Sequence, residues 1–236
     1  PWIAVFFPGI GHPTSLALCA VSRHGARMPL PLSAIPAQPR ENEPANAVSP
    51  SAETLALLAR RRSTKIAHLA EPGPTDPELD ALLRLAARVP DHGKLGPWRF
   101  VVIAGDARAR AGEKLAQVIA GDPGVDEARL QAARTLLSRA PTCVMVVSSP
   151  VESIKAPDWE QQLSAAAACF QLLLAAHAFG YAGCWLTEWP TYDARARAAL
   201  GLSEREQIAG FIYLGTAREP ATERFRADVA PRISRF

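Results

Sequence analysis

The chain has 236 residues, 48% of them hydrophobic and 21% charged, which is typical of a globular protein with room for one substantial domain. Its formal net charge of +3 argues against a dedicated nucleic-acid binder, which would carry a larger and more clustered basic excess. No stretch approaches the roughly 18 consecutive apolar residues that a membrane span needs.

Residues 1–50 differ from the rest of the chain. They hold nine of the 21 prolines and only five charged residues, and no helical or strand period persists in them. A secretory signal peptide is the alternative interpretation of the apolar residues at the start. However, the apolar run 3–7 has no basic region before it, and Pro8 and Pro13 would interrupt the apolar region of a signal peptide. We therefore predict a poorly ordered, proline-rich extension over residues 1–50 and a folded domain over residues 51–236.

Helices and strands follow one another closely in the predicted domain. Ser51 is the candidate N-cap of a first helix, which the apolar spacing carries to about residue 62. Thr75 and Glu78 form a capping box ahead of a second helix, which Pro90 ends. The aromatic and β-branched run 98–103 predicts a strand.

The middle of the chain predicts two alanine-rich amphipathic helices, at about 106–120 and 125–139. Residues 141–148 are apolar enough for a fully buried strand. The longest helix follows at about 158–179, and Gly180 is placed to end it as a left-handed cap.

The last elements are a short strand at 183–187, a helix at 192–199 and a strand at 208–214, followed by a polar tail. Strands and helices do not alternate from the first element, so we expect an α+β domain with a central sheet flanked by helices. Neither G-x-G-x-x-G nor G-x-x-x-x-G-K-[ST] occurs, so the two commonest nucleotide-binding signatures are absent.

The four cysteines lie far apart and form no C-x-x-C pair, which argues against a disulfide scaffold or a zinc ribbon. Cys143 and Cys184 fall in apolar strand-like runs and Cys169 in an apolar helix. We expect buried thiols and a reducing, cytoplasmic environment. The histidines show no metal-ligand spacing, and no metal site is predicted.

Two polar segments carry candidate chemistry. Residues 60–65 read RRRSTK, and such a cluster is either a solvated helix end or an anion site, because guanidinium groups bind phosphate bidentately. Residues 88–98 form a tight loop between a helix and a strand, in which two prolines and two glycines accompany Arg88, Asp91, His92 and Lys94. This grouping favours a functional loop over a surface turn.

These two segments, with five other motifs, resemble the FMN-dependent nitroreductase family, above all its short bacterial branch, in which a PDH loop precedes a PW strand. The similarity covers nearly everything after position 53. The motifs fall in the family's order: RRSTK at 61–65, a T-x-x-E helix start at 75–78, PDHGKLGPWRF at 90–100, APTCVMVV at 140–147, the helix opening Trp159-Glu160-Gln161, FGYAGCWLT at 179–187 and GFIYLGT at 210–216.

The resemblance implies a nitroreductase-like α+β fold, with a mainly antiparallel sheet flanked by helices, in a domain-interlocked homodimer that holds two FMN molecules at its interface. Arg61, Arg62 and Ser63 match the family motif that binds the FMN phosphate and ribityl chain. Lys65 matches a basic position near the flavin ring, where a cation would stabilise the negative charge of reduced flavin; Lys94 is the second choice for that role.

The resemblance also implies flavin contacts for five other residues. Arg88 and His92 match residues that reach the flavin bound mainly by the other subunit. Trp185, Leu186 and Thr187 match the segment that lies along the isoalloxazine.

The chain departs from the family pattern at two places. The loop has His92-Gly93-Lys94 where many members carry an asparagine, which leaves the partners of the flavin's pyrimidine edge open. A basic pair near the family's C-terminus often assists with the phosphate, and Arg232 and Arg235 are the candidates here.

The implied activity is a ping-pong transfer of hydride from NADH or NADPH through FMN to nitroaromatics, quinones or similar electron-poor acceptors. The flavin supplies the chemistry, so no side chain need act as a nucleophile. His92 would either orient a ligand or help to protonate the product.

The sequence is also compatible with other functions. The same fold would also suit a dehalogenating, flavin-degrading or peptide-oxidising enzyme. A non-catalytic FMN-binding protein is a further alternative, and a nucleic-acid binder that uses residues 60–62 is disfavoured by the small net charge.

Overall fold

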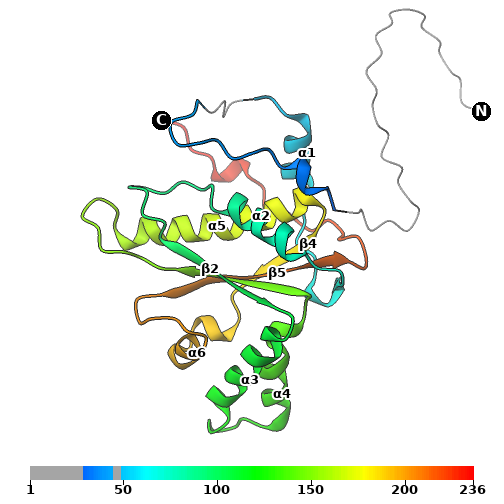
Figure 1. The fold of residues 1–236 in the computed structure, drawn as a ribbon, viewed down its shortest axis with the longest axis vertical. Helices are drawn as coiled ribbons and strands as arrows, with labels where there is room; N and C mark the ends of the chain where they lie inside the picture. The colour runs from blue at the N-terminus through cyan, green and yellow to red at the C-terminus, as the bar shows by residue number, and fades with distance from the viewer. Residues whose placement is uncertain (1–28, 45–48) are drawn as a thin grey trace, which may run out of the picture.

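A five-stranded antiparallel sheet forms the middle layer of the structure, a computed structural model that describes residues 29–44 and 49–236 (Figure 1). The strand β3 lies between β2 and β5, and β4 and β1 pair with successive parts of the other edge of β5. The strands are β1 (Leu69–Ala70), β2 (Trp98–Ala104), β3 (Thr142–Ser148), β4 (Ala182–Leu186) and β5 (Gln207–Ala217).

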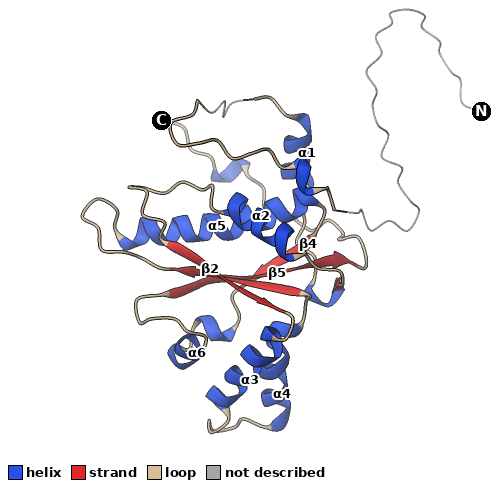
Figure 2. Ribbon diagram, in the orientation of Figure 1, coloured by secondary structure: helices blue, strands red, loops and turns tan. Residues whose placement is uncertain are grey.

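Helices cover both faces of the sheet (Figure 2). One face is covered by α2 and α5 and the other by α3, α4 and α6, while α1 lies beyond the layer of α2 and α5 (Figure 1). The helices are α1 (Ala52–Arg60), α2 (Asp76–Ala86), α3 (Ala107–Ile119), α4 (Glu127–Thr135), α5 (Asp158–Phe179) and α6 (Ala194–Ala199). Short 3-10 turns are η1 (Leu32–Ala34), η2 (Ile66–His68), η3 (Leu136–Ser138), η4 (Trp189–Thr191) and η5 (Ala230–Arg232).

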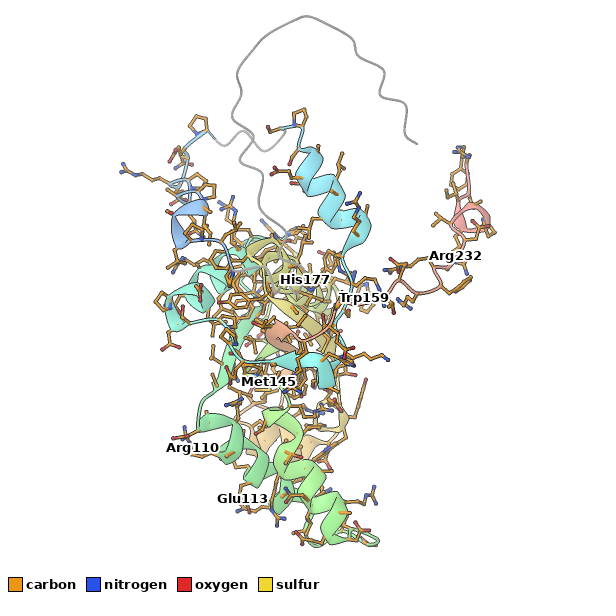
Figure 3. All side chains as sticks on the ribbon, turned by 90° about the vertical axis from the view of Figure 1, so that its right-hand side faces the viewer. Arg110, Glu113, Met145, Trp159, His177 and Arg232 are labelled. Carbon is orange, nitrogen blue, oxygen red and sulfur yellow. The ribbon has the colours of Figure 1, made fainter. Side chains whose placement is uncertain are left out.

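The alternation of side chains along the strands divides the core in two. Val144 and Ile212 pack with Leu172 of α5 on one face, and Met145 and Phe211 pack toward α3 on the other. Because both faces are covered, β3 is buried along its whole length and its sequence is continuously apolar. Met145 accordingly lies in the middle of the molecule (Figure 3).

The longest helix, α5, ends where the sequence predicts. Gly180 has a φ of 112° and closes the helix, because its amide donates to the carbonyl of Ala176. Among the described residues, α5 is the one helix long and apolar enough to cross a membrane, and half of its most apolar window is buried, as expected for a core helix.

The predicted α+β class and the mainly antiparallel sheet are confirmed. Two expectations were wrong in detail. The first helix ends at Arg60, so the residues that follow form a loop. The sequence predicts four strands, but the structure has a fifth, β1. Its two residues form a strand by pairing with the end of β5, and no local sequence pattern indicates this pairing.

Part of the predicted N-terminal extension lies on the domain. The Leu30 amide donates to the carbonyl of Phe179 at 2.8 Å, and Ile35 packs against the core between α2 and α5. Residues 1–28 and 45–48 lie outside the described part of the chain, and the domain boundary near Ser51 stays a prediction.

Three of the four cysteines are buried, unpaired thiols, as the sequence predicts: Cys143, Cys169 and Cys184. Burial raises the pKa of each thiol, to about 12 for Cys169 and about 11 for Cys184, so all three are protonated at neutral pH. Cys19 lies outside the described residues.

An ion pair connects β2 with the turn that precedes β5. Arg99 donates from Nε and Nη2 to the two carboxylate oxygens of Glu206, at 2.6 and 2.9 Å, and the Ser203 amide donates to the same carboxylate at 2.9 Å. The bond from Arg99, more than the one from Ser203, lowers the pKa of Glu206 to about 2, although burial opposes this.

We expect Glu206→Gln to lower the free energy of unfolding by about 1–3 kcal/mol at pH 7, because it removes charge-assisted hydrogen bonds from a nearly buried group. The carboxylate has a lower pKa in the folded protein than when unfolded, so its contribution is complete above the unfolded pKa of 4.5 and is lost as the pH falls toward 2. Denaturant unfolding at several pH values measures this. The exposed Glu204→Gln is the control, and a gap between wild type and Glu206→Gln that stays constant down to pH 2 would contradict the account.

Candidate functional site

A loop of five residues, 61–65, follows α1 and lies along the free edge of β4; we call it the cation loop. The Ser51 side chain caps α1 by accepting from the Thr54 amide at 3.2 Å, which confirms the predicted start of this helix. The chain then turns into an extended conformation at Arg61. The Thr64 amide donates to the carbonyl of Gly183 at 3.0 Å, and this bond joins the cation loop to β4.

Arg61 has a buried N–H group without a hydrogen-bond acceptor among the described residues. Its guanidinium carbon lies 5.7 Å from the ring centre of Phe170 on α5, and its buried Nε has no partner among the described residues. Burial lowers the pKa of Arg61, and Arg226, Arg62 and Arg224 lower it further, against a smaller opposing effect of Glu223. The surroundings of Arg61 are therefore positively charged, and an anion that accepts from Nε would be stabilised there.

The C-terminal segment supplies the additional cations. Arg62 Nε donates to the carbonyl of Thr222 at 3.0 Å and lies 3.5 Å from the Glu223 carboxylate. Arg62, predicted as a phosphate ligand, therefore holds the segment that carries Arg224 and Arg226 toward Arg61. Arg224 and Arg226 are cations near Arg61 that the sequence did not single out.

The predicted phosphate-assisting pair, Arg232 and Arg235, lies away from the cation loop of its own chain. Arg232 donates to the carbonyl of Asp228, and Figure 3 shows it at the end of a segment that leaves the body of the domain. Arg235 lies in the exposed tail that follows.

A hollow of about 150 Å³ opens between the cation loop and the segment after β5. Ligand sites for small molecules usually enclose about 300–1,000 Å³. The hollow in one copy of the chain is therefore smaller than a typical small-molecule site. The hollow is lined by Arg62, Ser63, Thr64, Lys65, His68, Glu219, Pro220, Ala221 and Thr222.

His177, in the last turn of α5, is a half-buried residue near the cation loop that the sequence did not single out, and its ring nitrogens are buried. Neither ring nitrogen has a partner among the described residues. Burial, and then the charge of Arg61, lower its pKa to about 4, so the imidazole is neutral at physiological pH. A lone histidine in an apolar helix carries no signal from which this proximity could be predicted.

The predicted flavin-facing segment begins in β4. The indole of Trp185 donates to the carbonyl of Ala209 at 3.2 Å and lies so close to Gly210 that a Cβ there would meet its Nε1 at 2.0 Å. Ala209 is the extra residue of a bulge, because Val146 pairs with Gly210 and Val147 with Ile208.

Trp185 and Leu186 point to opposite faces of the sheet. Trp185 packs with the core of α2 and α5, and Leu186 packs with the core of α3. Thr187, just past the strand, is exposed. Trp185 and Leu186 therefore lie on different faces of β4, and their contact with the flavin stays a prediction.

The loop between α2 and β2 is shaped by Asp91. Its carboxylate accepts from the amides of Leu95 and Gly96 at 3.1 and 2.8 Å, and Gly93 and Lys94 adopt φ values of 82° and 58°. Asp91 is therefore the turn-forming residue of the loop.

His92 and Arg88 are presented by this loop on the surface. Both are exposed, and His92 Nδ1 lies 2.7 Å from the Glu160 carboxylate in the first turn of α5. Arg61 lies over Phe170 of the same helix. Ten residues of helix separate Glu160 from Phe170, about 15 Å along the axis, so one chain does not bring His92 to the cation loop.

Comparisons with known proteins show relatives of the chain in sequence and in fold. The model of the nitroreductase family matches residues 58–216. A protein of Escherichia coli strain K12, provisionally named NAD(P)H nitroreductase YdjA, is 38% identical over 186 residues, which is 78% of this chain and all of that protein.

Two solved structures show the same fold. A nitroreductase-like family protein of Bacillus cereus superposes with a TM-score of 0.67 at 18% identity, over 80% of this chain and 99% of the other. A nitroreductase of Bacteroides fragilis with bound FMN gives a TM-score of 0.59 at 23% identity, over 79% of this chain and all of the other.

Proposed function

The chain belongs to the nitroreductase family of oxidoreductases, and on this basis we propose that it binds FMN and uses NADH or NADPH to reduce small electron-poor molecules. The observation that carries the proposal is the buried, unpartnered Nε of Arg61 in a cluster of cations beside β4. An FMN phosphate would accept from this group and would neutralise the repulsion among the arginines.

The residues around Arg61 fit the remaining parts of such a cofactor. Ser63 lines the hollow, and its hydroxyl could donate to a phosphate or ribityl oxygen. Lys65 lines the same hollow, is exposed, and would place a cation at the edge of the ring. The edge of β4 that contacts the cation loop at Gly183 continues toward Thr187. The isoalloxazine ring of FMN could lie along this edge.

Bound FMN would supply the chemistry, taking a hydride from the nicotinamide and passing it to a nitroaromatic, quinone or similar acceptor in a ping-pong cycle. The protein's part is to bind and orient. Positive charge from Lys65 would stabilise the reduced cofactor. The unpaired thiols of the described cysteines support the cytoplasm as the working compartment.

We further propose that two copies of the chain form a homodimer that completes each site. The hollow of one chain is too small for a whole cofactor, and His92 lies far from the cation loop of its own chain. Trp159, Leu163 and Phe170 are 67%, 50% and 40% exposed and form an apolar stripe along α5. On α1, Leu55 is exposed as well. Large apolar side chains exposed together on one helix face are typical of a protein–protein interface.

The double substitution of Arg61 and Ser63 by alanine tests the cofactor site. We expect colourless protein whose affinity for added FMN is lower by about 100-fold, because a charge-assisted bond and a hydroxyl donor to the phosphate are lost. The absorption spectrum and an FMN titration of the purified protein measure this. Arg60→Ala, in the exposed last residue of α1, is the matched control and should keep its flavin. Retention of stoichiometric FMN by the double variant would overturn the assignment.

The dimer is tested by Leu163→Asp, which places a charge in the apolar stripe without touching the monomer's core. We expect a monomer in analytical ultracentrifugation and weaker FMN binding, since burial of an unpaired carboxylate is costly. Arg110→Asp on α3, on the other side of the sheet from α5, is the control (Figure 3). An unchanged dimer in Leu163→Asp, or a wild-type monomer that binds FMN fully, would contradict this proposal.

A further inference from the structure

The turn that follows β4 contains a strained residue. Glu188 has a φ of 58° and a ψ of 166°, a conformation that is essentially confined to glycine. Such a conformation persists only when surrounding contacts hold it. Its side chain is largely covered, with 21% exposed.

Arg139, just before β3, provides the contact. Its guanidinium forms an ion pair with the Glu188 carboxylate. It also donates to the Tyr213 hydroxyl at 3.2 Å, lies 5.2 Å from the centre of that ring, and donates from Nε to the carbonyl of Leu136 at 2.9 Å. Tyr213 is fully buried in β5, so the guanidinium is fixed to the sheet on its inner side.

Thr187 precedes the strained residue and is held from the other side of the turn. The Tyr192 hydroxyl lies 3.2 Å from the Thr187 Oγ1, and the Thr191 hydroxyl donates to the Thr187 carbonyl. Arg197 donates to the carbonyl of Thr191 at 3.0 Å. The main chain at Thr187 is therefore set by two anchors, one at η4 and one at Glu188.

We propose that Arg139 is a positioning residue that holds Glu188 in its strained conformation and thereby fixes the main chain of Thr187 against the flavin ring. Arg139 would act through Glu188, since its guanidinium is committed to Glu188, Tyr213 and Leu136. The inference rests on the proposed function for the identity of the ligand. The link from Arg139 to the turn stands on the contacts alone.

The test uses Arg139→Met and the double variant that adds Glu188→Gly. Loss of the anchor should weaken FMN binding about tenfold and shift the visible flavin spectrum, because the strained turn relaxes. Amide hydrogen exchange at residues 187–189 should accelerate in the same variant. In the double variant glycine adopts the turn without strain, so affinity, spectrum and exchange should return toward wild type.

The matched control is Arg99→Met, which breaks a similar arginine–glutamate pair at β2. It should lower thermal stability and leave FMN affinity and exchange at residues 187–189 unchanged. Wild-type affinity, spectrum and exchange in Arg139→Met would overturn the inference, as would a double variant that fails to recover.

Two further outcomes are also decisive. If wild-type protein binds no FMN, the proposed function fails, and the exchange rates alone decide whether Arg139 sets the turn. If Arg139→Met does not fold, Glu188→Ala is compared with Glu188→Gly. The alanine variant keeps the strain and loses the anchor, so it alone should show faster exchange at residues 187–189. Equal exchange in the two variants would contradict the role of the strained turn.

Discussion

The hydrogen bond from the Thr64 amide to the Gly183 carbonyl is the contact on which the candidate site depends. It places the cation loop along the free edge of β4, an edge that would otherwise expose unpaired backbone groups. Gly183 is required there, since a Cβ would meet the Tyr213 carbonyl oxygen and the Leu214 side chain at 2.8 Å. Once the loop is docked, Arg61 comes to lie over α5 and Arg62 reaches the segment after β5. The cation loop thus contacts three parts of the chain that are distant in sequence: β4, α5 and the segment after β5.

The site assembled in this way is unfavourable without a ligand. Four arginines approach one another with one nearby glutamate, and the result is a lowered pKa at Arg61. A buried Nε without a partner adds a desolvation penalty. An anion removes both costs, and a second copy of the chain would cover the apolar stripe of α5. The strained turn at Glu188 carries a similar cost, and we propose that the ion pair with Arg139 retains it.

Much of the fold could be predicted because its signals are local. The continuous apolar run of β3, the capping box at Thr75 and the glycine that ends α5 all depend on neighbouring residues. The features that escaped prediction depend on contacts between distant segments. These include the pairing of β1 with β5, the approach of Arg224 to Arg61, and the neutral His177 behind it. The motif spacing singled out the cation loop and the loop of Asp91. It could not show that one chain holds them about 15 Å apart along α5.

The most direct test of the account is the absorption spectrum of the purified full chain, recorded before and after anaerobic addition of NADH and, separately, NADPH. We predict flavin bands in the isolated protein or after reconstitution with FMN, and loss of the band at about 450 nm with at least one nicotinamide. A protein that stays colourless and takes up no FMN would contradict the proposed cofactor site at Arg61. A protein that binds FMN but is bleached by neither nicotinamide would contradict the proposed oxidoreductase activity.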